Sequence, residues 1–356
     1  FPSTVPPTVT LSDSVTVNET AGGVNANFTV TLSATTTHRV TVNYTTENVT
    51  AEHDHDYTAT TGALVLQPGM TSGSVSVPIL DDVLDEDDET LKFKVAPNLG
   101  TITNAEKTIT IVDNDAPPTL SIGDAAAVVE GNVFPGPLSS FPVTLSAPSG
   151  RAITVTWAAA VNTAAVNDFL VTFGSFTIFP GQTTHEIIIP VIPDTYAEGD
   201  ETFFINLNKP ATAGLVDGQG VGTILDDDAP VLTTEQNSQR AIAFDAVTFV
   251  RDPFSITNQN YFGTDKRTRL AIFSNNLEVS PGMQVSVQAV DTQQVVHQLP
   301  VESVVAVPGF ITGRNLAILT QIVVRLPEGL TITGDLEISV TARGRTSNKI
   351  LVGVKP

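Results

Sequence analysis

The feature that most constrains the fold of this chain is an internal repeat with a period of 111 to 113 residues. Six sequence blocks recur in the same order. They begin at Pro7, Phe28, Val40, Gln67, Asp88 and Asp113, and their counterparts begin at Pro118, Phe141, Ile153, Phe179, Asp200 and Asp226. A period of this length is too long for a solenoid unit and corresponds to a whole domain. We therefore predict two tandem domains, a first copy at residues 7–117 and a second copy at residues 118–230.

Each copy has the pattern of an antiparallel β-sandwich. About seven short runs alternate apolar and polar residues, and Gly, Pro, Asn and Asp separate them. No segment shows a convincing apolar period of 3.6 residues, so we expect no helices of consequence.

Residues 231–356, the C-terminal segment, differ from both copies in charge. Residues 1–230 hold 6 Lys and Arg against 28 Asp and Glu, whereas the C-terminal segment holds 11 against 10. Five runs in this segment carry strand signals: 269–273, 284–290, 317–326, 336–342 and 350–354. We predict an all-β chain of three tandem antiparallel β-sandwich (immunoglobulin-like) domains forming a rod, preceded by an N-terminal arm or linker at residues 1–6.

Composition excludes several classes of function. The acidic balance of the two copies excludes nucleic acid as a partner, because phosphate binding needs a basic surface. No apolar run approaches the ~20 residues of a membrane-spanning helix, so we expect no membrane insertion. The chain has no cysteine and lacks the common catalytic motifs. Glu86 and Glu89 could be imagined as a glycosidase pair, but so many carboxylates surround them that we predict no enzymatic activity.

The most acidic stretch, Asp81–Glu89, holds seven carboxylates in nine residues. Two unit charges 4 Å apart repel by ~4 kcal/mol at an effective dielectric constant near 20. Apolar alternation precedes and follows the stretch, so it is predicted to be a loop joining two half-buried strands. Such a loop favours a site for a hard cation with oxygen ligands over a merely solvated turn.

The order of the acidic blocks resembles the Calx-β domain, the calcium-binding module of sodium–calcium exchangers and many bacterial surface proteins. The first copy shows Glu19, Asp56-Tyr57, Gln67-Pro68-Gly69, Asp81-Asp82, Glu86, Glu89 and Asp113-Asn114-Asp115 in that order, and the second copy repeats the order. The resemblance implies Ca²⁺ clustered at one end of each sandwich, near the link to the next domain. It implies ligands Glu19, Asp56, Asp81, Asp82, Glu86, Glu89, Asp113 and Asp115 in the first copy, and Glu130, Asp168, Asp194, Glu198, Glu201, Asp226, Asp227 and Asp228 in the second.

The second copy departs from the pattern at Pro193, which stands where the first copy has Asp81. We therefore expect one carboxylate fewer at that place and fewer ions in the second copy. The end of the C-terminal segment, from Gly334 to Asn348, resembles the closing hairpin of bacterial immunoglobulin-like (IPT/TIG-type) modules. That resemblance carries no functional residues across.

Two further motifs have alternative explanations. His53 and His55 could hold a transition metal, but they also suit a polar loop in which only Asp56 serves calcium. Four N-x-S/T sequons begin at Asn18, Asn27, Asn43 and Asn48, all in the first copy. They could be glycosylation sites, or chance in a chain rich in Thr and Asn.

Together these features predict a non-enzymatic, extracellular, calcium-binding structural or adhesive protein at a bacterial or archaeal cell surface. A sharper hypothesis is a secreted subunit of a surface filament, joined head to tail through residues 1–6 and the C-terminal segment. Expected partners are other copies of the chain, or another surface protein or glycan. The alternative is a calcium-binding regulatory or spacer module at the C-terminal end of a larger exported protein or enzyme.

Overall fold

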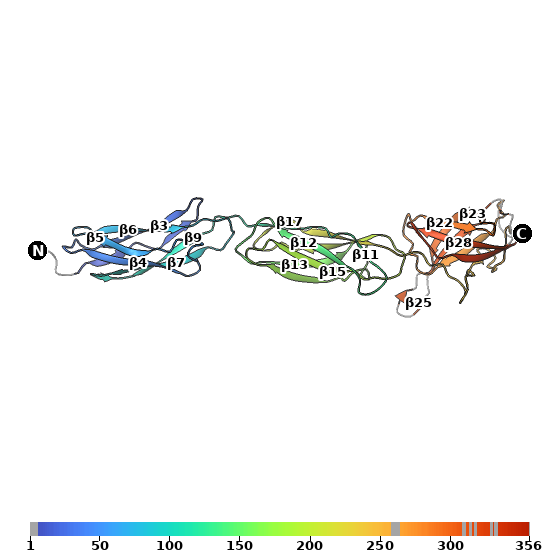
Figure 1. Cartoon of the computed structure of the whole chain (residues 1–356), viewed down its shortest axis with the longest axis horizontal. Helices are drawn as coiled ribbons and strands as arrows, with labels where there is room; N and C mark the ends of the chain where they lie inside the picture. Colours follow the sequence, from blue (N-terminus) through green and yellow to red (C-terminus); the bar gives the residue numbers. More distant parts are fainter. Residues whose placement is uncertain are drawn as a thin grey trace.

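The described part of the chain consists of β-strands arranged in three bodies along one long axis (Figure 1). The computed structural model describes residues 6–257, 264–307, 319–327, 330 and 334–355, together with the backbone of 311–312 and 315–316. The expected arm at 1–6 lies, except for Pro6, outside the described residues. No helix in the described ranges is long and apolar enough to cross a bilayer. The all-β prediction is confirmed.

The first copy is a sandwich of two sheets. One has the order β6-β3-β1-β8 and the other the order β2-β9-β7-β4-β5. The strands are β1 (Thr8–Leu11), β2 (Val15–Asn18), β3 (Val24–Leu32), β4 (Val40–Asn48), β5 (Thr61–Leu66), β6 (Ser72–Ile79), β7 (Glu89–Pro97), β8 (Thr101–Ile102) and β9 (Glu106–Val112). Neighbouring strands are antiparallel except for two parallel pairs, β1 with β8 and β2 with β9.

The second copy repeats this topology strand for strand, with sheets β15-β12-β10-β17 and β11-β18-β16-β13-β14. Its strands are β10 (Thr119–Ile122), β11 (Val128–Val129), β12 (Leu138–Leu145), β13 (Ile153–Val161), β14 (Phe173–Ile178), β15 (Thr184–Pro190), β16 (Glu201–Leu207), β17 (Gly214–Asp217) and β18 (Gln219–Leu225). The parallel pairs also recur, β10 with β17 and β11 with β18. The sequence repeat is therefore a repeat of the whole fold.

Apolar alternation along the strands builds one core in each copy. In β3 every second residue from Ala26 to Leu32 is buried, and the residues between them are exposed. Stacked aromatic rings join the two sheets: Phe28 lies 4.4 Å from Phe93, and Phe169 lies 4.2 Å from Phe203, between ring centroids. The asparagines of the four sequons all lie on the exposed faces or loops of the first copy.

The C-terminal segment also has two main sheets around its own core. They have the orders β19-β21-β27-β24 and β20-β30-β28-β22-β23, and β29 pairs with β28. The strands are β19 (Phe244–Asp245), β20 (Phe254–Ser255), β21 (Arg269–Ser274), β22 (Val285–Val290), β23 (Val296–Leu299), β24 (Val301–Ala306), β25 (Ile311–Thr312), β26 (Asn315–Leu316), β27 (Thr320–Arg325), β28 (Gly334–Ala342), β29 (Arg345–Thr346) and β30 (Ile350–Lys355). Residues 317–318 of the strand expected at 317–326 are outside the described residues.

The stacked rings of the second copy yield a prediction about stability. Phe203 is fully buried between Phe169 and Phe141, so Phe203→Ala should lower the unfolding free energy of the second copy by about 3–5 kcal/mol. Phe179→Ala is the matched control, because that ring is 62% exposed, and it should change stability by about 0.5 kcal/mol or less. Denaturant unfolding with calcium present measures both. Equal effects of the two substitutions would contradict this account of the core.

Candidate metal centre

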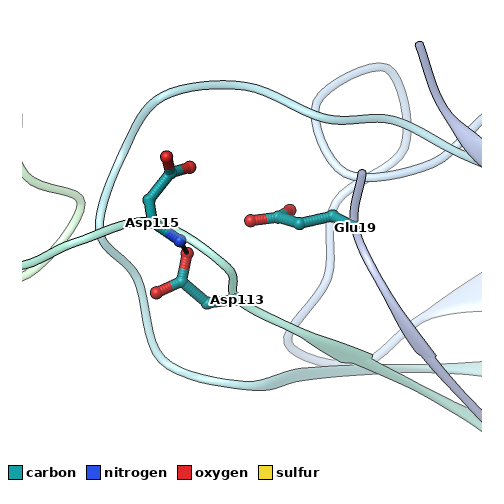
Figure 2. Close-up of side chains that lie close together, drawn as sticks. All are labelled: Glu19, Asp113 and Asp115. Carbon is teal, nitrogen blue, oxygen red and sulfur yellow. Dashed lines mark hydrogen bonds between the residues drawn. The ribbon is translucent and has the colours of Figure 1, made fainter. Parts of the chain in front are cut away.

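A parallel strand pair assembles the first group of carboxylates, which we call the edge cluster. Strand β2 runs beside β9 with Asn18 opposite Val112, so the next residues, Glu19 and Asp113, leave the sheet side by side. The backbone N–H of Glu19 donates to the carbonyl of Val112 at 3.2 Å, which holds this register to the end. Figure 2 shows that Glu19 approaches from one strand end while Asp113 and Asp115 approach from the other. Ligating oxygens of these three residues lie within 4.8 Å of one another.

The second copy builds its edge cluster in the same way. Strands β11 and β18 are parallel, and the N–H of Glu130 donates to the carbonyl of Leu225 at 3.1 Å. Glu130, Asp226 and Asp228 again offer oxygens within 4.8 Å of one another. In both copies the third member is held by a tight turn, in which the N–H of Asp115 or Asp228 donates to the Oδ1 of the aspartate two residues earlier, at 3.2 and 2.8 Å.

A second group, the loop cluster, joins two loops at the same end of each sandwich. In the first copy it consists of Asp56, Glu86 and Glu89, and in the second of Asp168, Glu198 and Glu201. Asp56 follows β4, and Asp168 follows β13. An isolated bridge of the next residue fixes each aspartate: Tyr57 pairs with Ile79, and Phe169 pairs with Val191. The loop cluster therefore rests on the end of the strand that leads into the acidic loop, residues 81–88 in the first copy and 193–200 in the second.

One aspartate of each copy acts electrostatically on both of its clusters. The charge of Asp82 raises the pKa of Glu19 in the edge cluster and of Glu86 in the loop cluster. Asp194, its counterpart, acts in the same way on Glu130 and Glu198. The two clusters of a copy are therefore electrostatically coupled, so a cation bound at one cluster would change the pKa values of carboxyls in the other.

Burial and mutual repulsion raise the pKa values of these carboxyls, which disfavours their ionisation when no cation is bound. Burial is the largest cause throughout, and neighbouring carboxylates add to it. The pKa of Glu19 rises to about 7 and that of Glu89 to about 8 in the first copy. In the second copy the pKa of both Glu130 and Glu198 rises to about 8, and that of Glu201 to about 9.

The oxygens of the edge clusters fit a hard cation better than they fit the protein alone. Three buried carboxylate oxygens have no hydrogen-bond donor among the described residues: Asp115 Oδ2, Glu130 Oε1 and Asp228 Oδ2. A buried acceptor without a partner costs about 1–3 kcal/mol. A Ca²⁺ ion takes six to eight oxygen ligands, many of them from carboxylates, so it would satisfy these atoms and cancel the repulsion.

Twelve of the sixteen predicted ligands thus lie in four clusters. Of the other four, Asp82 and Asp194 act electrostatically on both clusters of their copy, while Asp81 and Asp227 make hydrogen bonds with residues next to the edge clusters. Asp81 Oδ1 accepts from the Asn114 side chain at 3.1 Å, and Asp227 Oδ1 accepts from the N–H of Gly131 at 3.1 Å. Pro193 removes the first of these aspartates from the second copy, but Asp227 stands where the first copy has Asn114. The number of candidate carboxylates is therefore equal in the two copies.

The sequence pattern did not indicate that Asp85 contacts the second copy. Its side chain is buried and does not belong to a cluster; it lies against the second copy instead. The Oγ of Ser149 donates to the carbonyl of Asp85 at 3.0 Å, and the Arg151 guanidinium lies 3.7 Å from the Asp85 carboxylate. Arg151 also donates to the carbonyl of Glu86, a loop-cluster residue. The sequence did offer one indication that Arg151 pairs with an acidic loop, because Arg151 and Lys209 are the only Lys or Arg residues in a copy with 12 acidic residues.

The acidic loop of the second copy meets the C-terminal segment at the equivalent position. Ala197, the counterpart of Asp85, pairs with Leu277 and is buried in the core of the C-terminal segment. Arg343 donates to the carbonyl of Ala197 at 2.7 Å, and Arg345 donates to the carbonyl of Asp226 at 2.9 Å. In both joints, the loop that carries a cluster residue docks on the next body of the chain.

The histidines stand apart from the four clusters. His53 and His55 are exposed, and Nδ1 of His53 lies 2.9 Å from Oδ2 of Asp54. Within the described residues, each group of three or more candidate metal-ligating side chains consists of carboxylates alone. This arrangement favours the reading in which Asp56, and not the histidines, faces the metal site.

Comparison with known proteins gives one family match. The Calx-beta domain model matches residues 4–115 and 139–230, which include every cluster residue except Glu130. Adhesion G-protein coupled receptor V1 of Danio rerio is 27% identical over 223 residues, 60% of this chain and 4% of that protein. The chain therefore spans only a small fraction of this relative.

Two solved structures of Calx domains are also similar, at low TM-scores. CBD12 from CALX1.2 is 16% identical, with a TM-score of 0.30, over 61% of this chain and 98% of that one. The apo form of the Calx CBD1 domain is 23% identical, with a TM-score of 0.28, over 30% of this chain and 98% of that one.

The raised pKa values predict an unusual pH dependence when calcium is removed. The folded protein would hold protons on Glu130, Glu198 and Glu201 up to pH 8 or 9, whereas unfolded glutamates release them near 4.5. Between these values the folded state binds more protons, so the unfolding free energy falls as pH rises. Urea unfolding in chelator should therefore show lower stability at pH 8 than at pH 5.5. Calcium should weaken or reverse this fall in stability with pH. An unfolding free energy that rises with pH in chelator would contradict the prediction.

Proposed function

Because the chain belongs to the Calx-beta domain family and both of its copies gather buried carboxylates at one end, we propose that it is an extracellular, non-enzymatic, calcium-binding structural or adhesive protein. The observation that carries the proposal is the set of four carboxylate clusters, of which the two edge clusters hold buried oxygens with no donor among the described residues. Glu19, Asp113 and Asp115, with their counterparts in the second copy, would hold Ca²⁺ in the edge clusters. The loop clusters would hold it through Asp56, Glu86 and Glu89 and their counterparts. A bound ion would supply positive charge and accept coordination from these carboxylate oxygens, and its proposed role is structural.

A structural role is supported by where the clusters lie. The acidic loops carry Glu86 and Glu198, and the same loops contact the next body through Asp85 and Ala197. A cation that orders the loop would therefore also order the joint. With three bodies in line, stiff joints produce an extended spacer or rod (Figure 1).

An adhesive role at a cell surface is supported by family membership and by the similar adhesion receptor. We extend the proposal to a secreted surface-filament subunit that associates with its own copies or with another surface protein or glycan. The C-terminal segment, with two sheets around one core, is proposed as an immunoglobulin-like module of the IPT/TIG type.

A second candidate function rests on the short span of this chain against its relative. The matched region corresponds to 4% of the length of the adhesion receptor, so a region similar to this chain occurs there within a much longer protein. The chain would then be a calcium-binding spacer or regulatory module of a larger exported protein. The length of the native gene product distinguishes the two, because a catalytic or receptor domain in the same polypeptide would favour this second candidate.

Calcium binding itself is tested by a charge-removing substitution. Glu201→Gln removes one ligand charge and also relieves repulsion within the loop cluster, so its effect should depend on calcium. The melting temperature should rise in chelator and fall in calcium, relative to the unmodified protein, and titration calorimetry should show weaker or fewer calcium sites. At a calcium concentration 100 times the dissociation constant, one site contributes about 2.7 kcal/mol.

Glu186→Gln is the matched control, since Glu186 is exposed on β15, outside all four clusters. It should leave calcium titration unchanged. An unmodified protein that shows no calcium response in either calorimetry or melting would refute the metal assignment.

The structural role is tested by X-ray scattering and electron microscopy in calcium and in chelator. We expect an extended particle with a narrow distribution of inter-body angles in calcium, and a broader distribution in chelator because the acidic loops lose their counter-charge. Filaments in calcium would support the filament subunit. Extended single particles that bind calcium would favour the spacer instead, and equal angular spread in both conditions would contradict the structural role of the ion.

A further inference from the structure

The outer face of the five-stranded sheet differs between the two copies, although the strands are equivalent. In the first copy this face carries ion pairs: Lys94 with Glu47, and Lys92 with Glu106 at 2.9 Å. Lys92 stands between Glu47 on β4 and Thr108 on β9 in the register of the sheet. The face is therefore charged and hydrated, as an exposed sheet face normally is.

In the second copy the same positions are apolar. Ala160 stands where the first copy has Glu47, Phe204 replaces Lys92, and Val221 replaces Thr108. The register is conserved, with Phe204 between Ala160 and Val221. Beside them Phe173 replaces Thr61 opposite Ala158, and its side chain is 82% exposed. We call these five residues, Ala158, Ala160, Phe173, Phe204 and Val221, the apolar patch.

The remaining outward positions of this sheet are also uncharged. They are Val129, Thr154, Thr156, Ser175, Thr177, Thr202, Asn206, Gln219, Thr223 and Leu225. A whole sheet face without a charged side chain is unusual in a copy with 12 acidic and 2 basic residues. Within the apolar patch Ala158 and Phe173 are exposed, whereas Ala160, Phe204 and Val221 are half-buried. Contiguous apolar surface of this kind can mark an interaction site.

We propose that the apolar patch is a self-association surface, on which a second copy of this chain packs through the same patch in antiparallel orientation. The chemistry of the patch favours a second copy as the occupant, because an uncharged, apolar face matches the same face on another chain. Two chains that each carry a net charge of −21 repel one another over most of their surface. The uncharged face is where their sheets can approach without placing like charges opposite each other.

The charge distribution along the rod selects the antiparallel arrangement. The second copy is the middle body (Figure 1). A two-fold axis through its patch places the first copy of each chain, with 16 acidic and 4 basic residues, beside the nearly neutral C-terminal segment of the other. A parallel arrangement would place the two strongly acidic first copies together. A two-fold interface uses the same patch on both chains, which suits a surface that is uncharged and apolar on both sides.

The size of the face indicates a dimer of modest affinity. Five strands about 4.8 Å apart, with up to seven residues each at 3.3 Å, present a face of about 20 Å by 20 Å. Such an interface buries about 400 Å² on each chain, or about 800 Å² in total, which is below the ~1,200 Å² of stable specific complexes and corresponds to a weak, transient contact. Strand β14, which carries Phe173, is at the open edge of its sheet, so a partner meets no obstruction from a neighbouring strand of that sheet.

Sedimentation velocity over a concentration series tests the proposal, with the whole chain in saturating calcium. We expect a monomer–dimer equilibrium that strengthens as salt is added, because salt screens the repulsion between the acidic chains and leaves the apolar contact intact. Phe173→Glu should weaken association by about tenfold or more, because the two-fold axis brings the two new charges together. Thr61→Glu, at the equivalent position of the first copy, is the matched control and should leave it unchanged.

A second variant guards against an effect on folding. Ala160→Glu combined with Phe204→Lys introduces the charged residues that the first copy has at the equivalent positions of its own five-stranded sheet. This double variant should therefore fold, and it should also be a monomer. Because the chain has no cysteine, single introduced cysteines can carry fluorescent labels at Thr45 and at Gln293. Energy transfer should occur between the Thr45 label of one chain and the Gln293 label of the other.

Three results would overturn the proposal: a monomer at every concentration, a dimer that survives Phe173→Glu, or energy transfer between like ends only. These results are independent of the calcium assignment. A chain that fails to bind calcium but dimerises through the patch would refute the proposed function alone, and a calcium-binding monomer would refute the apolar patch alone.

Discussion

Repulsion between carboxylates that the fold itself brings together is the constraint on which the rest of this structure depends. Burial raises the pKa of Glu130, Glu198 and Glu201 well above the usual range of glutamate, and oxygens in the edge clusters remain without donors. The parallel pairs β2–β9 and β11–β18 hold the edge-cluster residues side by side, so these carboxylates cannot separate unless the strand pairing is broken. A divalent cation resolves the conflict by supplying charge where the backbone and side chains supply only oxygens.

The position of the clusters connects this local chemistry to the shape of the molecule. In each copy the acidic loop serves two purposes, because its glutamate faces the metal site while the residue before it pairs with the next body. The two joints are not chemically alike. Asp85 is held by Ser149 and Arg151 through polar contacts, whereas Ala197 is inserted into the core of the C-terminal segment. The first joint therefore relies on an ion pair of Arg151, whereas Arg343 and Arg345 at the second joint donate to backbone carbonyls.

The two copies show how one fold can carry different surfaces. Buried positions such as Phe93 and its counterpart Ile205 keep their apolar character, and the cluster residues keep theirs. Outward positions are free to change, and Lys92 of the first copy has become Phe204 in the second. Divergence of that kind, on a common backbone, is how a repeated domain acquires a task that its neighbour lacks.

The sequence by itself determined the all-β class, the repeat and the identity of most cluster residues. Period-2 alternation and a run of seven carboxylates are local signals that need no knowledge of distant contacts. Only the tertiary structure decided which carboxylates meet, since Glu19 and Asp113 are 94 residues apart and join through the register of a parallel strand pair. It also separated Asp85, which faces the next body, from its ligand-like neighbour Glu86. It showed that the outward positions of one sheet face are all uncharged. These properties depend on the pairing of distant strands, which local sequence patterns do not encode.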